Sequence, residues 1–418
     1  MTALFQTRAL GVFRYRDYRF LWSIMMLGSI VGWMRILGTA QWLLDETGSA
    51  MLVGAIGVIQ LVVQLPTTLW AGTLADRLDR RRVMAFGYGA SAISLLTIGL
   101  VNWQGQLTPT MVYIGIAIMA GTHVLSGPSR SAMIPIIVPE KDLMLASSTD
   151  VASSNAAAII GPLIFAGIAL VADLTAVFLV AAVIGVVAGL LPLFIGAAGV
   201  AHDETSVSGA KPSQLQQTRD GLRYVAKHPI LPGLFMLDVG ITTVSFYREI
   251  LPVLALGLFA GGAGATGMLG AANSAGAILG SLIAMLLVGY RATGMLVLYA
   301  SFAYGLILFG FGTASTLWLG MLMIGLLGAA DAVTVAVRHT TVMLTTPDEM
   351  RGRAFALMYV AAQTANNIGT IWVGAFAAAI GAANTMLLGG LLSITATALI
   401  WFFYKPIRSF RSGGESAD

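Results

Sequence analysis

The chain contains no cysteine, and only 4 of its 418 residues are histidines. Without thiols it forms no disulfide, binds no metal through sulfur and has no cysteine nucleophile. The histidines and carboxylates do not fall at the spacing of a metal site, and the Walker A sequence of ATP-binding proteins is absent. We therefore expect no metal, no cofactor and no ATP-driven step.

Charged residues are also scarce. They make up 10% of the chain, whereas a soluble protein of this size carries about 25%. Apolar residues make up 57%, and the mean hydropathy is +0.85. Because no soluble interior accommodates so much apolar surface, lipid must be the solvent for much of the chain. The net charge of +4 comes from short basic clusters between apolar runs, so we expect no nucleic-acid partner.

Twelve apolar stretches are each long enough to cross a bilayer, which takes ~20 residues. They lie at 20–44, 51–74, 83–101, 110–133, 148–171, 174–197, 230–256, 265–289, 293–312, 315–338, 354–379 and 383–404. The first is too long for a signal peptide and is not followed by a small-residue cleavage site. The pattern predicts an all-α polytopic membrane protein.

Lysine and arginine lie on one side of these stretches. They cluster in the N-terminus, in alternate loops and in the C-terminal tail, whereas the intervening loops contain none. The positive-inside rule then places both termini in the cytoplasm. We expect a multi-pass protein of the bacterial cytoplasmic (inner) membrane.

The chain also divides into two similar halves. One long polar segment separates six apolar stretches from six others, so we predict an N-terminal six-helix bundle over 1–197, a cytoplasmic linker with an amphipathic helix over 198–228, and a C-terminal six-helix bundle over 229–418. Arg130 matches Arg338 at an offset of 208 residues, and Arg35 matches Arg248 at an offset of 213. Such repeats are typical of secondary transporters, whose substrate site lies near the bilayer midplane between the repeats.

Three motifs resemble a known family. The segment from Gly72 to Arg82, GTLADRLDRRR, resembles the signature of the loop between helices 2 and 3 in the major facilitator superfamily. Gly127-Pro128-Ser129-Arg130 and the segment 347–353 are similar to the enterobactin-exporter-like branch of that superfamily, most of whose members are proton-coupled efflux proteins. The resemblance implies the major facilitator fold of two pseudo-symmetric bundles of six helices.

The resemblance also implies a function. We expect a secondary active transporter that exports a small organic solute, anionic or siderophore- or drug-like, by proton-coupled antiport and alternating access. Import or exchange of an organic anion, transport of a lipid, and a membrane sensor with a degenerate carrier fold stay open as alternatives. The expected partners are a small-molecule substrate, protons and the lipid bilayer, and the expected state is a monomer.

The loop signature predicts a cytoplasmic gate. A small residue lets neighbouring helices approach closely in lipid, and an aspartate at a helix end pairs with an arginine or with a helix N-terminus. Alternatively, the run of arginines only enforces the topology. The predicted gate residues are Gly72, Asp76, Arg77, Arg80, Arg130 and Arg338.

Ionisable residues inside the apolar stretches are candidate proton sites. Each costs roughly 2.5 to 3.5 kcal/mol to insert unless it faces a cavity or a partner. Asp331 and His123 are equivalent at the offset of 208, and each precedes an arginine by seven residues, or two helical turns. We predict proton coupling by Asp331, Asp238, Glu249 and His123, with a packing role as the alternative for His123.

Arg35 and Arg248 are the candidate substrate clamp. Both lie deep inside predicted spans that run outward, and two converging guanidinium groups suit a carboxylate or phosphate. The alternative is a gate in which Arg35 bonds Glu249 without touching substrate. Polar and aromatic neighbours complete the predicted substrate site, although a buried amide can also merely bridge helices. They are Trp33, Gln60, Gln64, Tyr247, Glu249, Asn155, Asn273, Tyr359 and Asn366.

Overall fold

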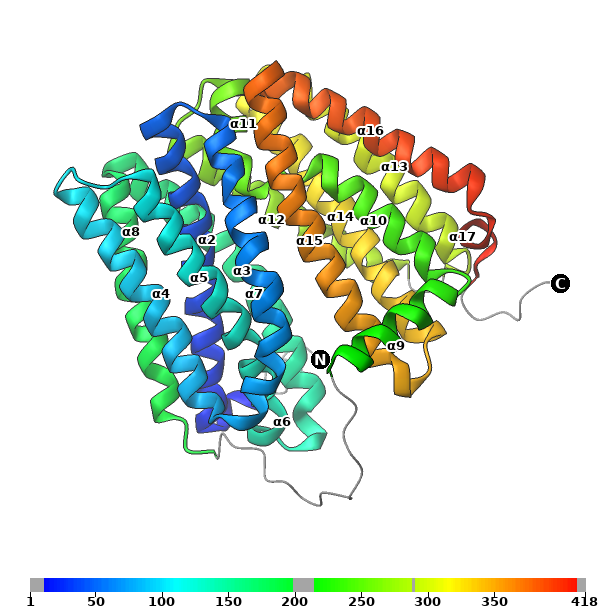
Figure 1. Cartoon of the computed structure of the whole chain (residues 1–418), viewed down its shortest axis with the longest axis horizontal. Coiled ribbons are helices and arrows are strands. Elements are labelled where there is room, and N and C mark those ends of the chain that lie inside the picture. The colour runs from blue at the N-terminus through cyan, green and yellow to red at the C-terminus, as the bar shows by residue number, and fades with distance from the viewer. Residues whose placement is uncertain (1–10, 198–213, 288–289, 412–418) are drawn as a thin grey trace, which may run out of the picture. The chain divides into compact units, whose positions relative to one another are not determined.

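The computed structural model describes residues 11–197, 214–287 and 290–411, with the backbone alone for 69–77 and 214–218 (Figure 1). Within these residues every regular element is a helix, which agrees with the predicted all-α class. The chain divides into two compact units. One consists of residues 1–43 and 59–208, and the other of residues 44–58 and 209–418.

The helices before the linker follow the predicted apolar stretches. Short helices η1 (Gly11–Arg14), α6 (Ile134–Ile137) and η2 (Leu191–Phe194) accompany the long ones. The long helices are α2 (Arg16–Thr47), α3 (Ala50–Arg77), α4 (Arg80–Trp103), α5 (Pro109–Ser131), α7 (Glu140–Val171) and α8 (Leu174–Leu190).

The helices after residue 213 begin with α9 (Gln214–Lys227), which falls on the predicted amphipathic helix of the linker. The short elements η3 (Arg248–Ile250) and α17 (Lys405–Ser409) also occur here. The remaining helices are α10 (Leu231–Ser245), α11 (Leu251–Phe259), α12 (Ala263–Leu286), α13 (Thr293–Gly312), α14 (Leu317–Thr345), α15 (Asp348–Ile380) and α16 (Ala382–Phe403).

Eleven helices or helix pairs in the described part of the chain are long and apolar enough to cross a membrane. The twelfth predicted span, at 354–379, is covered by α15, which is 33 residues long but is not among the eleven. Its middle carries the amides Gln363, Asn366 and Asn367, and these lower its hydropathy. Length alone suffices for α15 to cross a bilayer, since each residue adds ~1.5 Å to a helix.

Side-chain caps explain where several helices begin. The carboxylate of Asp79 accepts a hydrogen bond from the backbone N–H of Arg81, 2.9 Å away, at the start of α4. Asp173 accepts from Ala176 at 3.0 Å at the start of α8. Thr316 does the same for α14. Each bond satisfies a backbone donor that the first turn of a helix leaves without a partner.

Each unit packs through small residues. In the first, Gly189 of α8 lies against the backbone of α4 at Gly89. In the second, Gly276 and Gly280 of α12 lie against the backbone of α14, so close that a methyl group would collide with it. Lipid supplies no hydrophobic drive for helix association, so close backbone contact supplies van der Waals attraction instead.

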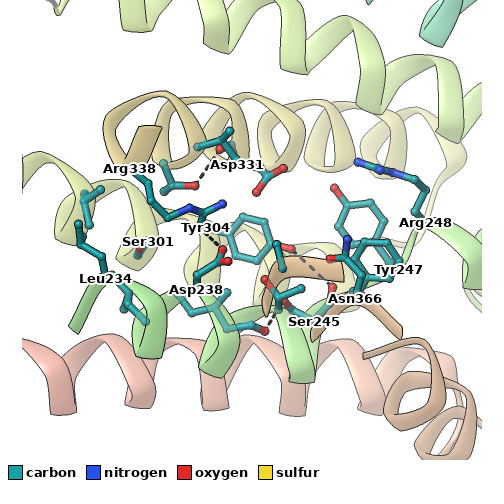
Figure 2. A pocket seen from close by; sticks show the side chains of 18 residues that line it. Leu234, Asp238, Ser245, Tyr247, Arg248, Ser301, Tyr304, Asp331, Arg338 and Asn366 are labelled. Carbon is teal, nitrogen blue, oxygen red and sulfur yellow. Dashed lines mark hydrogen bonds and ion pairs between the residues drawn. The ribbon is translucent and has the colours of Figure 1, made fainter. Parts of the chain in front are cut away.

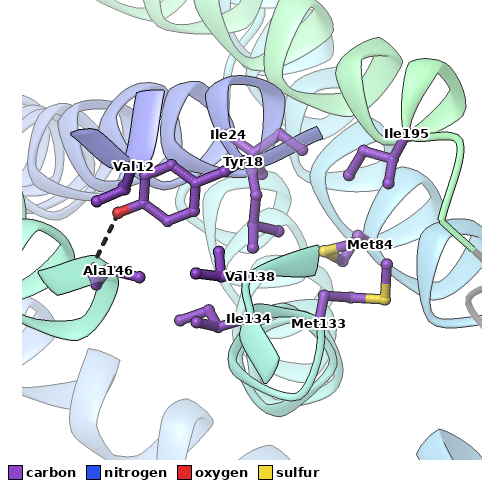
Figure 3. Close-up of a cluster of buried hydrophobic side chains, with 10 residues drawn as sticks. Val12, Tyr18, Ile24, Met84, Met133, Ile134, Val138, Ala146 and Ile195 are labelled. Atoms are coloured by element: carbon purple, nitrogen blue, oxygen red, sulfur yellow. Dashed lines mark hydrogen bonds between the residues drawn. The ribbon is translucent and has the colours of Figure 1, made fainter. Parts of the chain in front are cut away.

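A cluster of buried hydrophobic side chains lies in the first unit (Figure 3). Tyr18 of α2 lies within it, and its hydroxyl donates to the carbonyl of Ala146 in α7 at 3.0 Å. This bond satisfies a polar group that is otherwise fully buried. The other buried members are Val12, Leu21, Ile24, Met84, Met133, Ile134, Val138 and Ile195.

The seventh predicted span, 230–256, is not one continuous helix. The segment α10 ends at Ser245, Phe246 is extended, and the chain resumes as η3 and α11. Pro252 explains the break, because its ring lacks an N–H and would collide with the carbonyl of Arg248 in a continuous helix. The equivalent position of the first half, at the offset of 213, is Thr39, and α2 runs through it unbroken.

Candidate functional site

A cavity of about 190 Å³ lies in the second unit, beside the break between α10 and η3. Helices α10, α13, α14 and α15 and the segment 246–248 line it (Figure 2). The polar and charged residues of the lining are Asp238, Thr242, Ser245, Tyr247, Arg248, Ser301, Tyr304, Asp331, Thr334, Arg338 and Asn366.

The cavity contains two arginines and two aspartates. Arg338 of α14 forms an ion pair with Asp238 of α10, and the two side chains are only 10% and 15% exposed. Arg248 lies at the far side of the cavity from Arg338, and Asp331 and Tyr304 lie between them (Figure 2). Asp331 is exposed although it lies in the middle of α14, because it faces the cavity.

The charges of the cavity sum to zero when both carboxyl groups are ionised. Arg338 neutralises Asp238 directly. Asp331 is not part of an ion pair among the described residues, and the charges that act on it are Arg248, Arg338 and Asp238. Protonation of Asp331 therefore leaves one net positive charge in the cavity.

Hydrogen bonds hold the broken segment in place behind the cavity. The side-chain amide of Asn273 in α12 donates to the hydroxyl of Tyr247 at 2.6 Å and to the carbonyl of Ile324 at 3.2 Å. Thr370 of α15 donates to the carboxyl of Glu249 at 3.1 Å. These contacts fix the direction in which the segment presents Arg248, as a second layer of residues does in a preorganised site.

The first unit has an ion pair of its own at the equivalent arginine. Arg130 of α5 donates to both carboxyl oxygens of Asp150, at 2.6 and 3.0 Å. Asp150 lies in the third turn of α7, which begins at Glu140. It is the partner of a predicted gate residue.

The structure brings six of the predicted site residues together in the cavity of the second unit. They are the substrate candidates Tyr247, Arg248 and Asn366, the proton candidates Asp238 and Asp331, and the gate candidate Arg338.

Three further candidates belong to the same unit but do not line the cavity. Glu249 and Asn273 are buried in the layer behind it. Tyr359 is 53% exposed on α15. The proton role of Asp238 stays a prediction, and in the structure its carboxylate pairs with Arg338.

The other candidates belong to the first unit. Gln60 is buried there, Trp33, Arg35, Gln64 and Asn155 are half-buried, and His123 is exposed. The charge of Arg35 acts on His123, so these two lie within electrostatic range. Arg80 donates to the carbonyl of Ala132 at 3.4 Å. The side chains of Gly72, Asp76 and Arg77 lie outside the described residues.

The sequence analysis missed five polar residues of the cavity. Their signal is helical spacing, because polar side chains three, four or seven positions apart share a face. On α10 the spacing joins Asp238 to Thr242 and Ser245, and on α14 it joins Asp331 to Thr334 and Arg338. The missed residues are Thr242, Ser245, Ser301, Tyr304 and Thr334.

Comparison with known proteins gives a consistent result. A sequence profile of a family described as transmembrane secretion effector matches residues 7–413. The enterobactin exporter EntS of Citrobacter koseri is 24% identical over 366 residues, which are 87% of this chain and 83% of that protein. The enterobactin exporter EntS of Escherichia coli O81 is 25% identical over the same shares.

Solved structures match over almost the whole chain. A mutant of the nucleoside transporter NupG superimposes with a TM-score of 0.78 at 13% identity, covering 94% of this chain and 99% of that one. A D-xylose–proton symporter superimposes with a TM-score of 0.71 at 14% identity, over 94% and 99%. At such identities the likeness shows the fold alone.

Proposed function

Because the chain belongs to the transmembrane secretion effector family of major facilitator transporters, we propose that it exports a small organic solute in exchange for protons. Its fold and family are those of membrane transporters rather than enzymes. The observation that carries the proposal is Asp331, a carboxyl group in the middle of a membrane helix that faces a cavity between two arginines.

Asp331 is the proton carrier in this proposal. A carboxylate in a membrane interior is costly, and proton binding removes that cost. Asp238 does not take this role, because Arg338 stabilises its charge directly. Asp331 has no such partner among the described residues, so its charge changes at a smaller cost.

Competition at Asp331 couples the two fluxes. A solute with a positive charge or a strong hydrogen-bond donor stabilises the ionised form of Asp331 and displaces the proton. Protons in excess on the other side of the membrane then displace the solute. A coupling ion drives a cycle of this kind only when its affinity differs between the two access states.

Arg248 favours a second candidate function, the import or exchange of an organic anion. An anion bound to Arg248 takes over the charge balance that Asp331 otherwise provides. Asp331 then binds a proton more readily, so anion and proton bind together rather than in competition. The predicted clamp of Arg248 with Arg35 belongs to this alternative and stays a prediction.

The test uses the full chain in proteoliposomes with an imposed pH gradient. A panel of organic anions, siderophores and cationic drugs identifies a transported solute. Asp331→Asn is expected to abolish flux driven by the pH gradient and to retain solute binding, because the amide keeps the shape but carries no proton. Wild-type driven flux in this variant would rule out Asp331 as the carrier.

Asp348→Asn is the matched control, since it makes the same chemical change at a side chain that is 88% exposed outside the cavity. It is expected to transport as the wild type does. The pH dependence of binding separates the two candidate functions. Affinity that rises with pH indicates competition and antiport, whereas affinity that rises on acidification indicates joint binding of anion and proton.

A further inference from the structure

The linker helix α9 is attached to the second unit along one face. Val225 is buried in a cluster with Leu231, Val342, Ala354 and Met358. Gly221 lies so close to α15 that a methyl group in its place would be 3.2 Å from Arg353 and from Leu357. This face of α9 is therefore covered by protein.

Polar contacts fasten the end of the same helix. The hydroxyl of Tyr224 donates to the carbonyl of Thr345 at 3.3 Å, and the Nε2 atom of His228 lies 3.3 Å from the same oxygen. The Nδ1 atom of His228 accepts from the backbone N–H groups of Ile230 and Leu231, at 3.2 and 3.3 Å. Burial lowers the pKa of His228, which favours the neutral ring that these acceptor bonds require.

The opposite face of α9 is basic and exposed. Arg219, Arg223 and Lys227 follow one another at four-residue spacing and are all exposed. Leu222 lies on the same face and is 59% exposed. The neighbouring Asp220 lies 3.8 Å from Arg353, which partly balances its charge. A shallow hollow at the edge of this face is lined by Asp220, Arg223, Tyr224, Lys227, His228 and Pro229.

The position of α9 places this face at the edge of the bilayer. Thr345, which bonds Tyr224 and His228, is the last residue of a membrane-spanning helix. Figure 1 shows α9 beside the first turns of α15, at the end of the unit where α14 also ends. An element at the end of a span lies at the level of the lipid headgroups.

From these observations we infer that Arg219, Arg223 and Lys227 form a binding surface for the headgroups of anionic phospholipids. Three guanidinium and ammonium groups in a row match a layer of phosphates in charge. Leu222 inserts at the boundary between headgroups and acyl chains, where an amphipathic helix places its apolar side chains. The inference does not depend on the transported solute.

The experiment uses the absence of cysteine. Ala226→Cys on the exposed face provides a single site for an environment-sensitive fluorophore in the full chain. The labelled protein is reconstituted in phosphatidylcholine vesicles with increasing fractions of phosphatidylglycerol and a quencher at headgroup depth. Quenching is expected to rise with the anionic fraction and to weaken as added salt shortens the screening length.

The variant Arg219→Gln/Arg223→Gln/Lys227→Gln is expected to lose most of the rise in quenching with the phosphatidylglycerol fraction, since each basic residue contributes roughly fivefold to the affinity. Arg219→Lys/Arg223→Lys keeps the charge and is expected to bind as the parent does, which shows that altered side chains are tolerated in the fold. Unchanged quenching in the triple glutamine variant would overturn the inference.

Two further arms keep the test specific. Arg291→Gln/Lys405→Gln/Arg411→Gln removes the same charge from exposed positions of the same unit and is expected to leave quenching unchanged. If quenching falls equally in this control, the effect depends only on the net charge of the unit, and the proposal is overturned. Inorganic phosphate is also added to the labelled protein in detergent. If it changes the fluorescence as much as lipid does, the surface binds a free anion rather than lipid headgroups.

Discussion

At the scale of single residues, equivalent arginines in the two halves pair with aspartates from helices that are not equivalent. Arg130 and Arg338 are equivalent in sequence, and each is neutralised by one aspartate. Asp150 comes from α7 and Asp238 from α10, so the acids do not follow the repeat. The arginines could be predicted from the offset of 208 residues. The acids could not, because which carboxylate lies near each arginine depends on how the helices pack.

Asp238→Asn is expected to destabilise the protein by about 3–5 kcal/mol, because it leaves the charge of Arg338 buried without a partner. The measurement is thermal or denaturant unfolding in detergent. The double variant Asp238→Asn/Arg338→Gln removes both charges and is expected to recover part of the loss. A single variant as stable as the wild type would contradict a structural role for the pair.

The predicted pair of Arg35 and Arg248 is also a residue-scale hypothesis. If both bind an anionic solute, Arg35→Gln and Arg248→Gln should each weaken its binding by about tenfold or more, since a bond to a charged group contributes ~1.5–3 kcal/mol. Binding to the purified protein by calorimetry measures this. Unchanged affinity in both variants would leave only the gate hypothesis.

At the scale of elements, the hydrophobic pattern predicted where helices lie and missed where one breaks. The stretch 230–256 is apolar throughout, so hydropathy alone favoured one helix. The helix ends at Ser245, and the chain resumes as η3 and then as α11, which has Pro252 in its first turn; the segment between them presents Arg248 to the cavity. The start of α7 was also predicted eight residues late, because its first turns are polar.

The start of α4 yields a prediction about pH. Hydrogen bonding from Arg81 holds the pKa of Asp79 below its ordinary value. The stability that this carboxylate contributes is therefore complete above the ordinary pKa near 4 and is lost as the pH falls through the lower folded value. Asp79→Asn keeps a cap but removes the charge, and it should cost about 1 kcal/mol at neutral pH.

Unfolding of the wild type and of Asp79→Asn over a range of pH checks this expectation. The difference between the two proteins should shrink as the pH falls well below 4. A difference that stays constant with pH would show that the carboxylate charge does not contribute. Asp348→Asn serves as a comparison, because its carboxylate is 88% exposed and pairs with Arg351 in the first turn of α15 rather than accepting a cap bond.

At the scale of the whole molecule, composition alone was enough to predict a helical membrane protein. A chain with 10% charged and 57% apolar residues must use lipid as a solvent, and its regular apolar stretches require helices, since lipid offers no partner to free backbone groups. The family profile over residues 7–413 and the solved structures confirm the predicted major facilitator fold.

What the sequence by itself determined is therefore the membrane, the helices, the family and the repeated arginines, since all depend on local composition or fixed spacing along the chain. Tertiary structure alone decided that Asp238 balances Arg338, that Asp331 faces a cavity, and that Tyr304 and Ser301 join it. Helices far apart in sequence meet at this cavity. The polar groups that face one another there depend on how each helix is rotated and where it breaks, and a local sequence pattern does not determine either.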